Sequence, residues 1–453
     1  MINRKTALTT ALLLLFAAAP ALAQQHGTTS GSGEGSGAAA TKAAPKLLYR
    51  DITIQYVRPQ DARGINVFEP PKDDDTPFNG LKLEFGAAFT QQFQALDHSN
   101  TAAPNIIDGV DLNRLVDLGP GFNLATANLY LNAQLAPGVR VALESYMSSR
   151  HHAEFWVKGG YLQIDASPIE MELLENLMRY VTLKAGHFEI NYGDAHFRRT
   201  DNGNAFFNPF VGNLIMDAFA TEIGAEVYFR KDALLAMVGI TNGEIRGAVT
   251  DPDSRAPSFI GKLGFDQQFD DRLRVRMTGS LYTTEKSQNN TLYAGDRAGS
   301  RYYNVMDNAL GTDFRNGRIN PGLSDKVTAW QLNPFVKLGG LELFGVYEKA
   351  AGRSAAEAEN RTWNQYAGDI VYRFLANENA YVGARYNVVE GHLAGVANKV
   401  GIDRVQVGAG WFVTPTVLLK GEYVRQTYND FPANDIRNGG KFDGFIIEGV
   451  VSF

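Results

Sequence analysis

The last residues of the chain, Gly444 to Phe453, read GFIIEGVVSF. Counted back from Phe453, every second residue is apolar or glycine, and the positions between them include Ser452 and Glu448. This alternation predicts a β-strand with one apolar face. A strand of roughly 9–11 residues can cross a bilayer, and a water-filled interior would solvate Glu448 on the other face. An edge strand of a soluble sheet could have the same sequence, so the rest of the chain decides between the two.

The N-terminus has the features of a secretory signal peptide. Arg4 and Lys5 precede an apolar run that extends to Ala19, and Ala21-Leu22-Ala23 supplies a small-residue cleavage pattern. We therefore expect residues 1–23 to be removed on export. The chain has no cysteine, which excludes a lipid-anchored lipoprotein, a disulfide framework and a thiolate metal site.

The composition favours a β-protein of the cell envelope. The sequence contains 46 Gly, 27 Phe and 19 Tyr among 453 residues and carries a formal net charge of −6. Beyond the signal peptide it has no apolar run of about 18 residues, so it predicts no transmembrane helix. The acidic balance argues against nucleic acid as a partner. These features suit a β-barrel, whose hydropathy signal is weak in each strand.

Two segments precede the regular part of the sequence. Residues 24–46 are rich in Gly, Ser, Thr and Ala, which predicts a flexible leader. Residues 47–80 contain one alternating run and a Pro- and Asp-rich stretch, Pro70 to Asp75, and we interpret them as a periplasmic segment leading into the barrel. The predicted domains are therefore a signal peptide (1–23), a leader with a periplasmic segment (24–80) and a barrel (81–453).

From residue 81 onward, alternation and turn residues predict about 16 strands, an even number as in bacterial barrels. The expected strands are residues 81–96, 122–135, 139–149, 155–165, 180–192, 218–229, 234–242, 258–268, 273–283, 327–338, 341–349, 363–374, 380–390, 404–412, 417–428 and 445–453.

The connections between these strands alternate between tight turns and longer polar loops. Tight turns include Ala136-Pro137-Gly138, Gly339-Gly340 and Thr414-Pro415-Thr416, whereas the longest loop runs from Glu285 to Asp325. Short turns at one end and long loops at the other are typical of outer-membrane barrels, with the turns in the periplasm. The sequence thus predicts an all-β fold, a transmembrane antiparallel β-barrel of about 16 strands, located in the cell outer membrane.

Alternation also divides each strand into a lipid-facing and an inward-facing set. Residues 129–135 place Leu and Ala on the lipid side and Tyr, Asn and Gln on the inner side. A polar inner face on a barrel this wide implies a water-filled channel, and such a channel conducts small solutes. Inward charges by this assignment include Arg140, Lys184, Lys262, Arg272, Arg274, Arg276, Arg373, Arg385 and Lys420, and Glu144, Glu222, Glu226, Asp266, Asp369, Glu422 and Glu448.

The segment Leu183 to Gly193 ends the fifth expected strand and reads LKAGHFEINYG. The following loop, Asp194 to Asp217, contains the run HFRRTDNGNAFFNPF. A Gly-x-Phe strand that ends on an aromatic-Gly pair, before a long loop between strands five and six, resembles the bacterial outer-membrane porins, nearest to the phosphate-selective porin O/P family. The resemblance covers residues 81–453 in architecture, but in motif only this segment and Phe453.

In porins, the loop between strands five and six folds into the barrel and narrows it. The resemblance therefore implies a pore constriction made by charged residues of this loop. Charges in a narrow passage act at a lower effective dielectric than in bulk water, so a few of them can set ion preference. A loop lying outside on the surface is the alternative, although its phenylalanines favour packing against a wall. The constriction residues implied are Asp194, His196, Arg198, Arg199 and Asp201.

One departure from the porin O/P pattern concerns selectivity. Phosphate selectivity in that family depends on a lysine-rich constriction, and residues 192–216 contain no lysine. The arginines at 272, 274 and 276 could attract anions, but neighbouring acidic residues could cancel their field.

We therefore predict an outer-membrane porin for passive diffusion of small hydrophilic solutes or ions, with anions such as phosphate as one candidate. Expected partners are outer-membrane lipid and lipopolysaccharide, these solutes, and a homotrimer implied by the resemblance. We expect no cofactor and no metal.

Two alternative functions remain open from the sequence. A closed barrel could act as an adhesin or receptor through long loops such as Glu285 to Asp325. An outer-membrane hydrolase could place catalytic groups at an outer hairpin, where the sequence has His151-His152-Ala153-Glu154. The sequence contains no motif of the Gly-x-Ser-x-Gly or His-Glu-x-x-His type to support hydrolysis.

Overall fold

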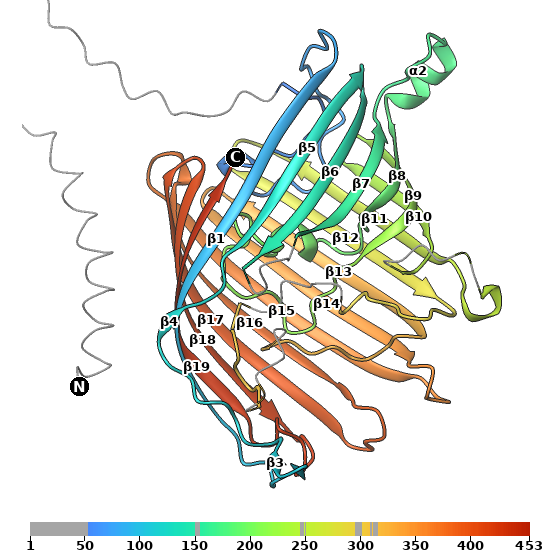
Figure 1. The fold of residues 1–453 in the computed structure, drawn as a ribbon. Coiled ribbons are helices and arrows are strands. Elements are labelled where there is room, and N and C mark those ends of the chain that lie inside the picture. The colour runs from blue at the N-terminus through green and yellow to red at the C-terminus, as the bar shows by residue number, and fades with distance from the viewer. Residues whose placement is uncertain are drawn as a thin grey trace, which may run out of the picture. The chain divides into compact units, whose positions relative to one another are not determined.

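The computed structural model describes residues 53–149, 155–244, 249, 251–294, 301–308, 310 and 316–453. These residues belong to one compact unit, Leu47–Phe453. The expected signal peptide, the expected leader up to residue 52 and the hairpin residues 151–154 lie outside the described part of the chain. Figure 1 shows the described residues as long, tilted strands lying side by side.

One antiparallel sheet of 17 strands forms the molecule, and β4 (Gly121–Phe122) contributes only two residues to it. The other strands form the wall. They are β1 (Lys82–Ser99), β5 (Thr126–Ala136), β6 (Val139–Ser148), β7 (Phe155–Ile164), β8 (Val181–Glu189), β9 (Thr221–Lys231), β10 (Leu234–Thr241), β11 (Ser258–Gln268), β12 (Leu273–Thr284), β13 (Lys326–Leu338), β14 (Leu341–Arg353), β15 (Arg361–Phe374), β16 (Ala380–His392), β17 (Lys399–Thr414), β18 (Val417–Asn429) and β19 (Lys441–Ser452).

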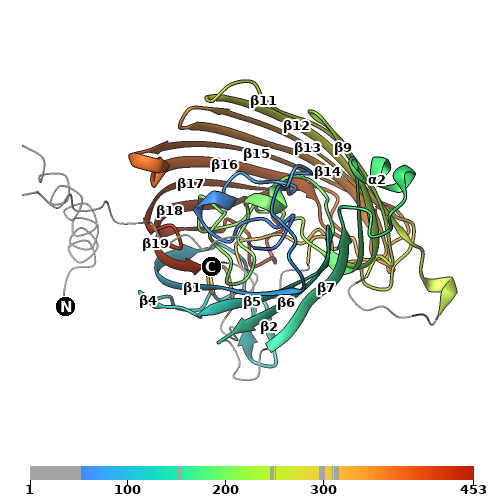
Figure 2. The same ribbon diagram turned by 90° about the horizontal axis from the view of Figure 1, so that it is seen from above.

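Pairing of the first wall strand with the last closes the sheet into a barrel. β1 pairs with β19 from Ala88↔Ser452 to Ser99↔Lys441, and on its other side with β5 from Lys82↔Gln134 to Thr90↔Thr126. Figure 2 shows the strands as a ring around a central region. The predicted fold, a closed antiparallel barrel of 16 strands, is confirmed, and each wall strand overlaps the range expected from the sequence.

The two faces of the wall differ as alternation predicts. Large apolar side chains such as Leu83 and Leu263, each 70 % exposed, cover the outer face. Polar side chains such as Gln365 and Glu448, each 0 % exposed, lie on the inner face. A hydrocarbon solvent requires apolar outer side chains and backbone groups paired with each other, and a closed wall of antiparallel strands with an apolar exterior meets both requirements.

The two ends of the barrel are unlike. One end has tight hairpins, as at Ala136↔Val139, Leu338↔Leu341 and Thr414↔Val417, and also holds Phe453, whose backbone pairs with Ala87. We call this the turn end. The opposite end has the longer connections, among them the short hairpin of β2 (Ile106–Ile107) and β3 (Val110–Asp111).

The helical elements are few and short in the described part of the chain. Besides α2 (Glu172–Met178), they are the 3-10 turns η1 (Ala62–Gly64), η2 (Ala195–Arg198), η3 (Pro252–Ser254) and η4 (Ala376–Glu378). No helix among the described residues has the length and apolar character needed to cross a membrane.

The barrel predicts how charged substitutions on the outer face should behave. Leu263 lies at the centre of β11, and Phe269 lies exposed just beyond the end of that strand. We expect Leu263→Arg to lower the free energy of unfolding in lipid vesicles by about 2–4 kcal/mol, because the charge would sit near the bilayer midplane, and Phe269→Arg by only about 0–1 kcal/mol. Denaturant titration followed by tryptophan fluorescence measures both; equal costs at the two positions would contradict a membrane-spanning wall.

Candidate functional site

The connection between β8 and β9, residues 190–220, is the best candidate for a functional segment, and we call it the β8–β9 segment. It is buried against inward-facing side chains of the wall. Lys420 Nζ donates hydrogen bonds to the carbonyl oxygens of Ala205 (2.9 Å) and Phe210 (3.0 Å). The Val211 N–H donates to Glu422 (2.7 Å). These contacts fix residues 205–211 against β18.

The same segment also contacts wall strands on the other side of the β1–β19 seam. The Thr90 hydroxyl of β1 donates to the Gly203 carbonyl oxygen (2.7 Å), and the Asn202 side chain donates to the Ala127 carbonyl oxygen of β5 (2.7 Å). Hydrogen bonds to β1, β5 and β18 therefore hold the β8–β9 segment at several points of the ring.

The residues that precede β1 also contact the inner wall, and we call residues 53–80 the N-terminal segment. Phe68 is buried against the rings of Phe197 and Phe335. Glu69 forms ion pairs with Lys262 (3.1 Å) and Arg276 (2.8 Å). The sequence showed no sign of these contacts, because the residues around Phe68 and Glu69 have no regular period from which burial can be inferred.

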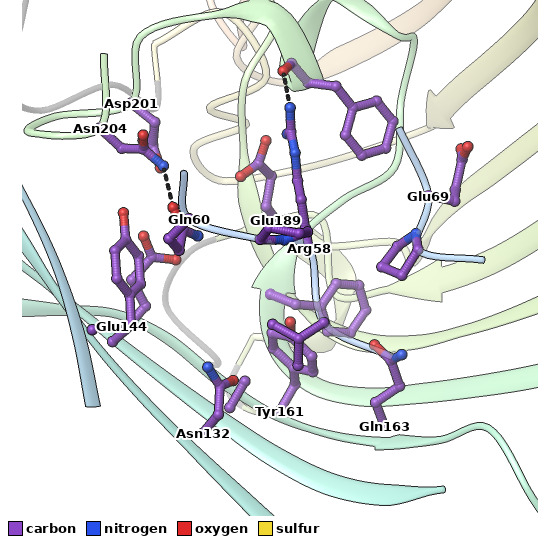
Figure 3. Close-up of a pocket in the computed structure, with 18 of the residues that line it drawn as sticks. Arg58, Gln60, Glu69, Asn132, Glu144, Tyr161, Gln163, Glu189, Asp201 and Asn204 are labelled. Carbon is purple, nitrogen blue, oxygen red and sulfur yellow. Dashed lines mark hydrogen bonds between the residues drawn. The ribbon is translucent and has the colours of Figure 1, made fainter. Parts of the chain in front are cut away.

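A cavity of about 300 Å³ lies between the two segments and the wall (Figure 3). Thr416 and Phe453 contribute to its lining, so it reaches the turn end of the barrel. Tyr130, Tyr161 and Phe188 provide aromatic surface. Of the residues predicted as constriction residues or inward charges, six line it: Arg140, Glu144, Lys184, His196, Arg199 and Asp201.

Lys158 is the centre of charge pairing in this cavity. Its ammonium group lies 2.5 Å from Asp201, 3.0 Å from Glu144 and 3.1 Å from Glu189. The sequence analysis did not single out Lys158, although alternation along β7 from the exposed Phe155 and Val157 would have placed it on the inner face. Lys158 ties Asp201 of the β8–β9 segment to β6, β7 and β8.

His196 and Arg199 are both held by neighbours rather than free in the cavity. His196 places Nδ1 2.8 Å from Glu189 and Nε2 3.0 Å from Asn191. Burial lowers the pKa of His196, and the neighbouring Glu189 opposes this effect only in part. Arg199 makes a bidentate pair with Asp217, at 3.0 and 2.7 Å.

Asp194 lies outside the cavity, fully buried among wall residues. It accepts hydrogen bonds from Arg276 (2.8 and 2.9 Å) and Thr278 (2.8 Å), and it pairs with Lys262 at 2.6 Å. Burial alone would raise the pKa of Asp194, but the charges of Lys262 and Arg276 outweigh it and hold the pKa below its ordinary value. Asp194 therefore fixes the start of the β8–β9 segment to β11 and β12.

The remaining predicted basic residues divide into paired and exposed ones. Arg198 is buried and donates to Glu342 (3.1 Å), and Arg274 pairs with Asp266 (2.7 Å). Arg276 lies beside Asp194, as described above. Arg272 was predicted to share the inward face with the other two arginines of β12, but it is exposed, because it belongs to the turn that precedes the strand.

Arg140 is the exception to this pairing. Its side chain is buried, with 5 % exposed, and it donates to neutral oxygens of Gln163 (2.8 Å) and Asn132 (3.5 Å). Its Nε has no hydrogen-bond partner, and no carboxylate of the described residues lies within ion-pair distance. Lys184 lies in the same row of the wall, across Gln163, and both cations face the Tyr161 ring at 5.7 and 4.8 Å.

Comparison with known proteins identifies structures with a similar fold but does not assign the chain to a family. No protein-family model matches the sequence, and no curated protein matches it. An anion-selective porin from Comamonas acidovorans aligns with a TM-score of 0.51 at 11 % identity, over 82 % of this chain and 100 % of that chain. The outer membrane channel DcaP of Acinetobacter baumannii gives 0.46 at 9 %, covering 83 % and 99 %. The trimer form of OmpT, an outer membrane protein of Vibrio cholerae, gives 0.47 at 12 %, covering 83 % and 100 %. The alignment with the Comamonas porin shows that the fold is the barrel fold of that outer-membrane protein.

The environment of Asp194 predicts a pH-dependent stability. Its folded-state pKa is lower than in the unfolded chain, so its stabilising effect is fully present above about pH 4 and is lost as the pH falls through the lowered value. We expect Asp194→Asn to cost about 1.5–3 kcal/mol at neutral pH, because hydrogen bonds between charged groups are lost. This difference from the wild type should shrink in acid, where Asp194 itself becomes neutral.

Denaturant unfolding in vesicles at several pH values measures this difference. Asp75→Asn is a matched control, since Asp75 is an exposed carboxylate of the N-terminal segment. A cost for Asp194→Asn that stays constant down to acid pH, or that the control shares, would refute the assignment.

Proposed function

We propose that this protein is an outer-membrane porin, a channel for passive diffusion of small hydrophilic solutes or ions. The observation that carries the proposal is the closed barrel of 16 wall strands with an apolar outer face and a charged inner face. Such a barrel is wide enough to enclose an aqueous passage, whereas a barrel of about 8 strands fills with side chains. The turn end, which holds Phe453, would face the periplasm.

We propose further that the β8–β9 segment forms the constriction. Its hydrogen bonds to β1, β5 and β18 support this role, as does the cavity bounded by His196, Arg199 and Asp201. In this proposal, a solute passes along the inner faces of β5 to β8, where cations and carboxylates alternate. Arg198 and Asp194 would act by holding the segment to the wall, since neither lines the cavity.

The proposed selectivity is a modest preference for anions, with phosphate as one candidate. Most cations of the passage are neutralised by carboxylates. On the wall, this leaves Arg140 and Lys184 as sources of positive potential, beside Arg58 of the N-terminal segment, which donates to the carbonyl oxygens of Gly64 and Phe197. The Lys184 ammonium lies 3.6 Å from the Glu226 carboxylate, a longer separation than in the ion pairs of Lys158. A small anion between Arg140 and Lys184 would provide a counter-charge for the Arg140 guanidinium, which is otherwise buried without one.

A closed barrel that acts as a receptor or adhesin is the second candidate. It is favoured by the extent to which loops fill the interior: Tyr293 and Tyr302 of the connection between β12 and β13 donate hydrogen bonds to the buried Glu348 and Glu422. An enzymatic role has less support, and its candidate residues, 151–154, lie outside the described part of the chain.

Single-channel conductance of the refolded mature protein in a planar bilayer tests the channel proposal. Steady conductance is expected, with a reversal potential under a salt gradient that indicates anion preference. Absence of conductance from a barrel shown to be folded would refute the channel and favour the receptor.

Arg140→Gln should weaken the anion preference. Removing one unpaired charge from a narrow passage changes the ion free energy by of the order of 1 kcal/mol, which shifts the reversal potential toward the cation side. Arg272→Gln is the control, because Arg272 is exposed outside the cavity. A shift of equal size in both variants would show that Arg140 is not part of the passage.

The oligomeric state belongs to the same proposal. We propose a homotrimer, and sedimentation of the detergent-solubilised protein should give three times the monomer mass after correction for bound detergent. A monomer under all mild detergents tested would refute it.

A further inference from the structure

We propose that residues 53–70 form a built-in plug at the turn end of the barrel, and that this plug leaves its seat when the channel conducts fully. This inference rests on the proposed channel function but adds a gating element to it. Figure 2 shows the N-terminal segment, in blue, within the ring of strands.

Three anchors on well-separated wall strands hold the segment across the opening. Near its start, the Gln55 N–H donates to the Gln134 side chain of β5 (2.8 Å). In the middle, the Ala62 N–H donates to the Pro415 carbonyl oxygen in the turn between β17 and β18 (3.0 Å). At its end, Glu69 pairs with cations of β11 and β12. A chain tied to these three places spans the mouth of the barrel.

The two sides of the segment line two different cavities. The cavity of about 300 Å³ described above includes Arg58 and Gln60 and lies toward β5 to β8. A second cavity of about 260 Å³ includes Ala62 and Asn66, together with residues of β12, β13 and the β17–β18 turn. Both reach the turn end, so removal of residues 53–70 would join them into one wider opening.

The wall is built so that its charges keep partners when the plug leaves. Without Glu69, Lys262 still pairs with Asp194 at 2.6 Å, and Arg276 still pairs with Asp194 and Asp266. Glu342, which accepts a hydrogen bond from Asn66, also pairs with Arg373 at 2.7 Å. Stranding a buried charge costs several kcal/mol, and this arrangement avoids that cost in the open state.

The linker to the barrel permits such a movement. Residues 71–81 alternate between exposed and half-buried positions, and none of them is buried. Gly80, just before β1, has φ +111°, a conformation that glycine adopts without strain. Residues 53–70 can therefore move as a unit while β1 stays in the sheet. Their tether is the linker, which Lys72 holds to the wall through the carbonyl oxygens of Asp165 (2.5 Å) and Val181 (2.8 Å).

A reversible disulfide tests the proposal directly, because the native chain has no cysteine. The Ala62 N–H donates to the Pro415 carbonyl oxygen at 3.0 Å, so the two backbones approach closely enough for a disulfide to be tried between them. The double variant Ala62→Cys/Pro415→Cys should show low conductance when oxidised and recover on reduction, in the same bilayer. Each single-cysteine variant serves as a control that should not respond to reductant.

Deletion of residues 24–70 gives the opposite test. We expect roughly a doubling of single-channel conductance or more, since the passage widens, whereas deletion of residues 24–46 should leave conductance unchanged. Glu69→Gln should act in the same direction as the larger deletion, with Asp75→Asn as its matched control on the exposed linker.

The outcomes separate this proposal from the channel proposal. Conductance that is the same in the full chain, the larger deletion and both redox states of the double variant would overturn the plug and leave the channel intact. Conductance only after deletion would support both. No conductance from any folded variant would overturn both.

Discussion

Closure of the sheet between β1 and β19 is the constraint on which the rest of the structure depends. A strand edge in hydrocarbon leaves backbone N–H and C=O groups without partners, and each such group costs several kcal/mol. The β1–β19 register runs from Ala88↔Ser452 to Ser99↔Lys441, so almost the whole of β19 is paired. Once the ring is closed, the strand period of two decides the rest: one set of side chains faces out and the other faces a shared interior.

Many charged side chains lie in that interior, where water is scarce, and most of them form ion pairs. Lys158 forms ion pairs with three carboxylates, Arg385 pairs with Asp369, and Lys420 pairs with Glu448. Several of these groups come from segments rather than from the wall, as with Asp194 and Asp201. Because an unpaired buried charge is far costlier than a paired one, the ion pairs of Asp194 and Asp201 help to position the β8–β9 segment. In the proposed channel, the few cations without a close counter-charge, such as Arg140, would then dominate the field that a solute meets.

The wall could be predicted from the sequence because its signal is local. In residues 234–241, alternation and the turn before Leu234 are enough to set the strand and its faces, and the structure agrees. Arg272 departs from its predicted face because the strand begins one residue later, at Leu273. Contacts within the interior have no such local signal. Asn66, Phe68 and Glu69 contact residues more than 100 positions away, and nothing in the neighbouring sequence identifies those partners.

Barrel topology also explains why the N-terminal segment is found where it is. β1 starts at the turn end, so the chain that precedes it must emerge there, beside the mouth of the barrel. A short linker, residues 71–81, then keeps residues 53–70 at an effective concentration in the millimolar range. At that effective concentration, contacts with a dissociation constant of about 1 mM, or about 4 kcal/mol of binding free energy, are enough to keep the segment bound to the wall half of the time. The ion pairs of Glu69 and the packing of Phe68 therefore need not be individually strong to keep the segment seated.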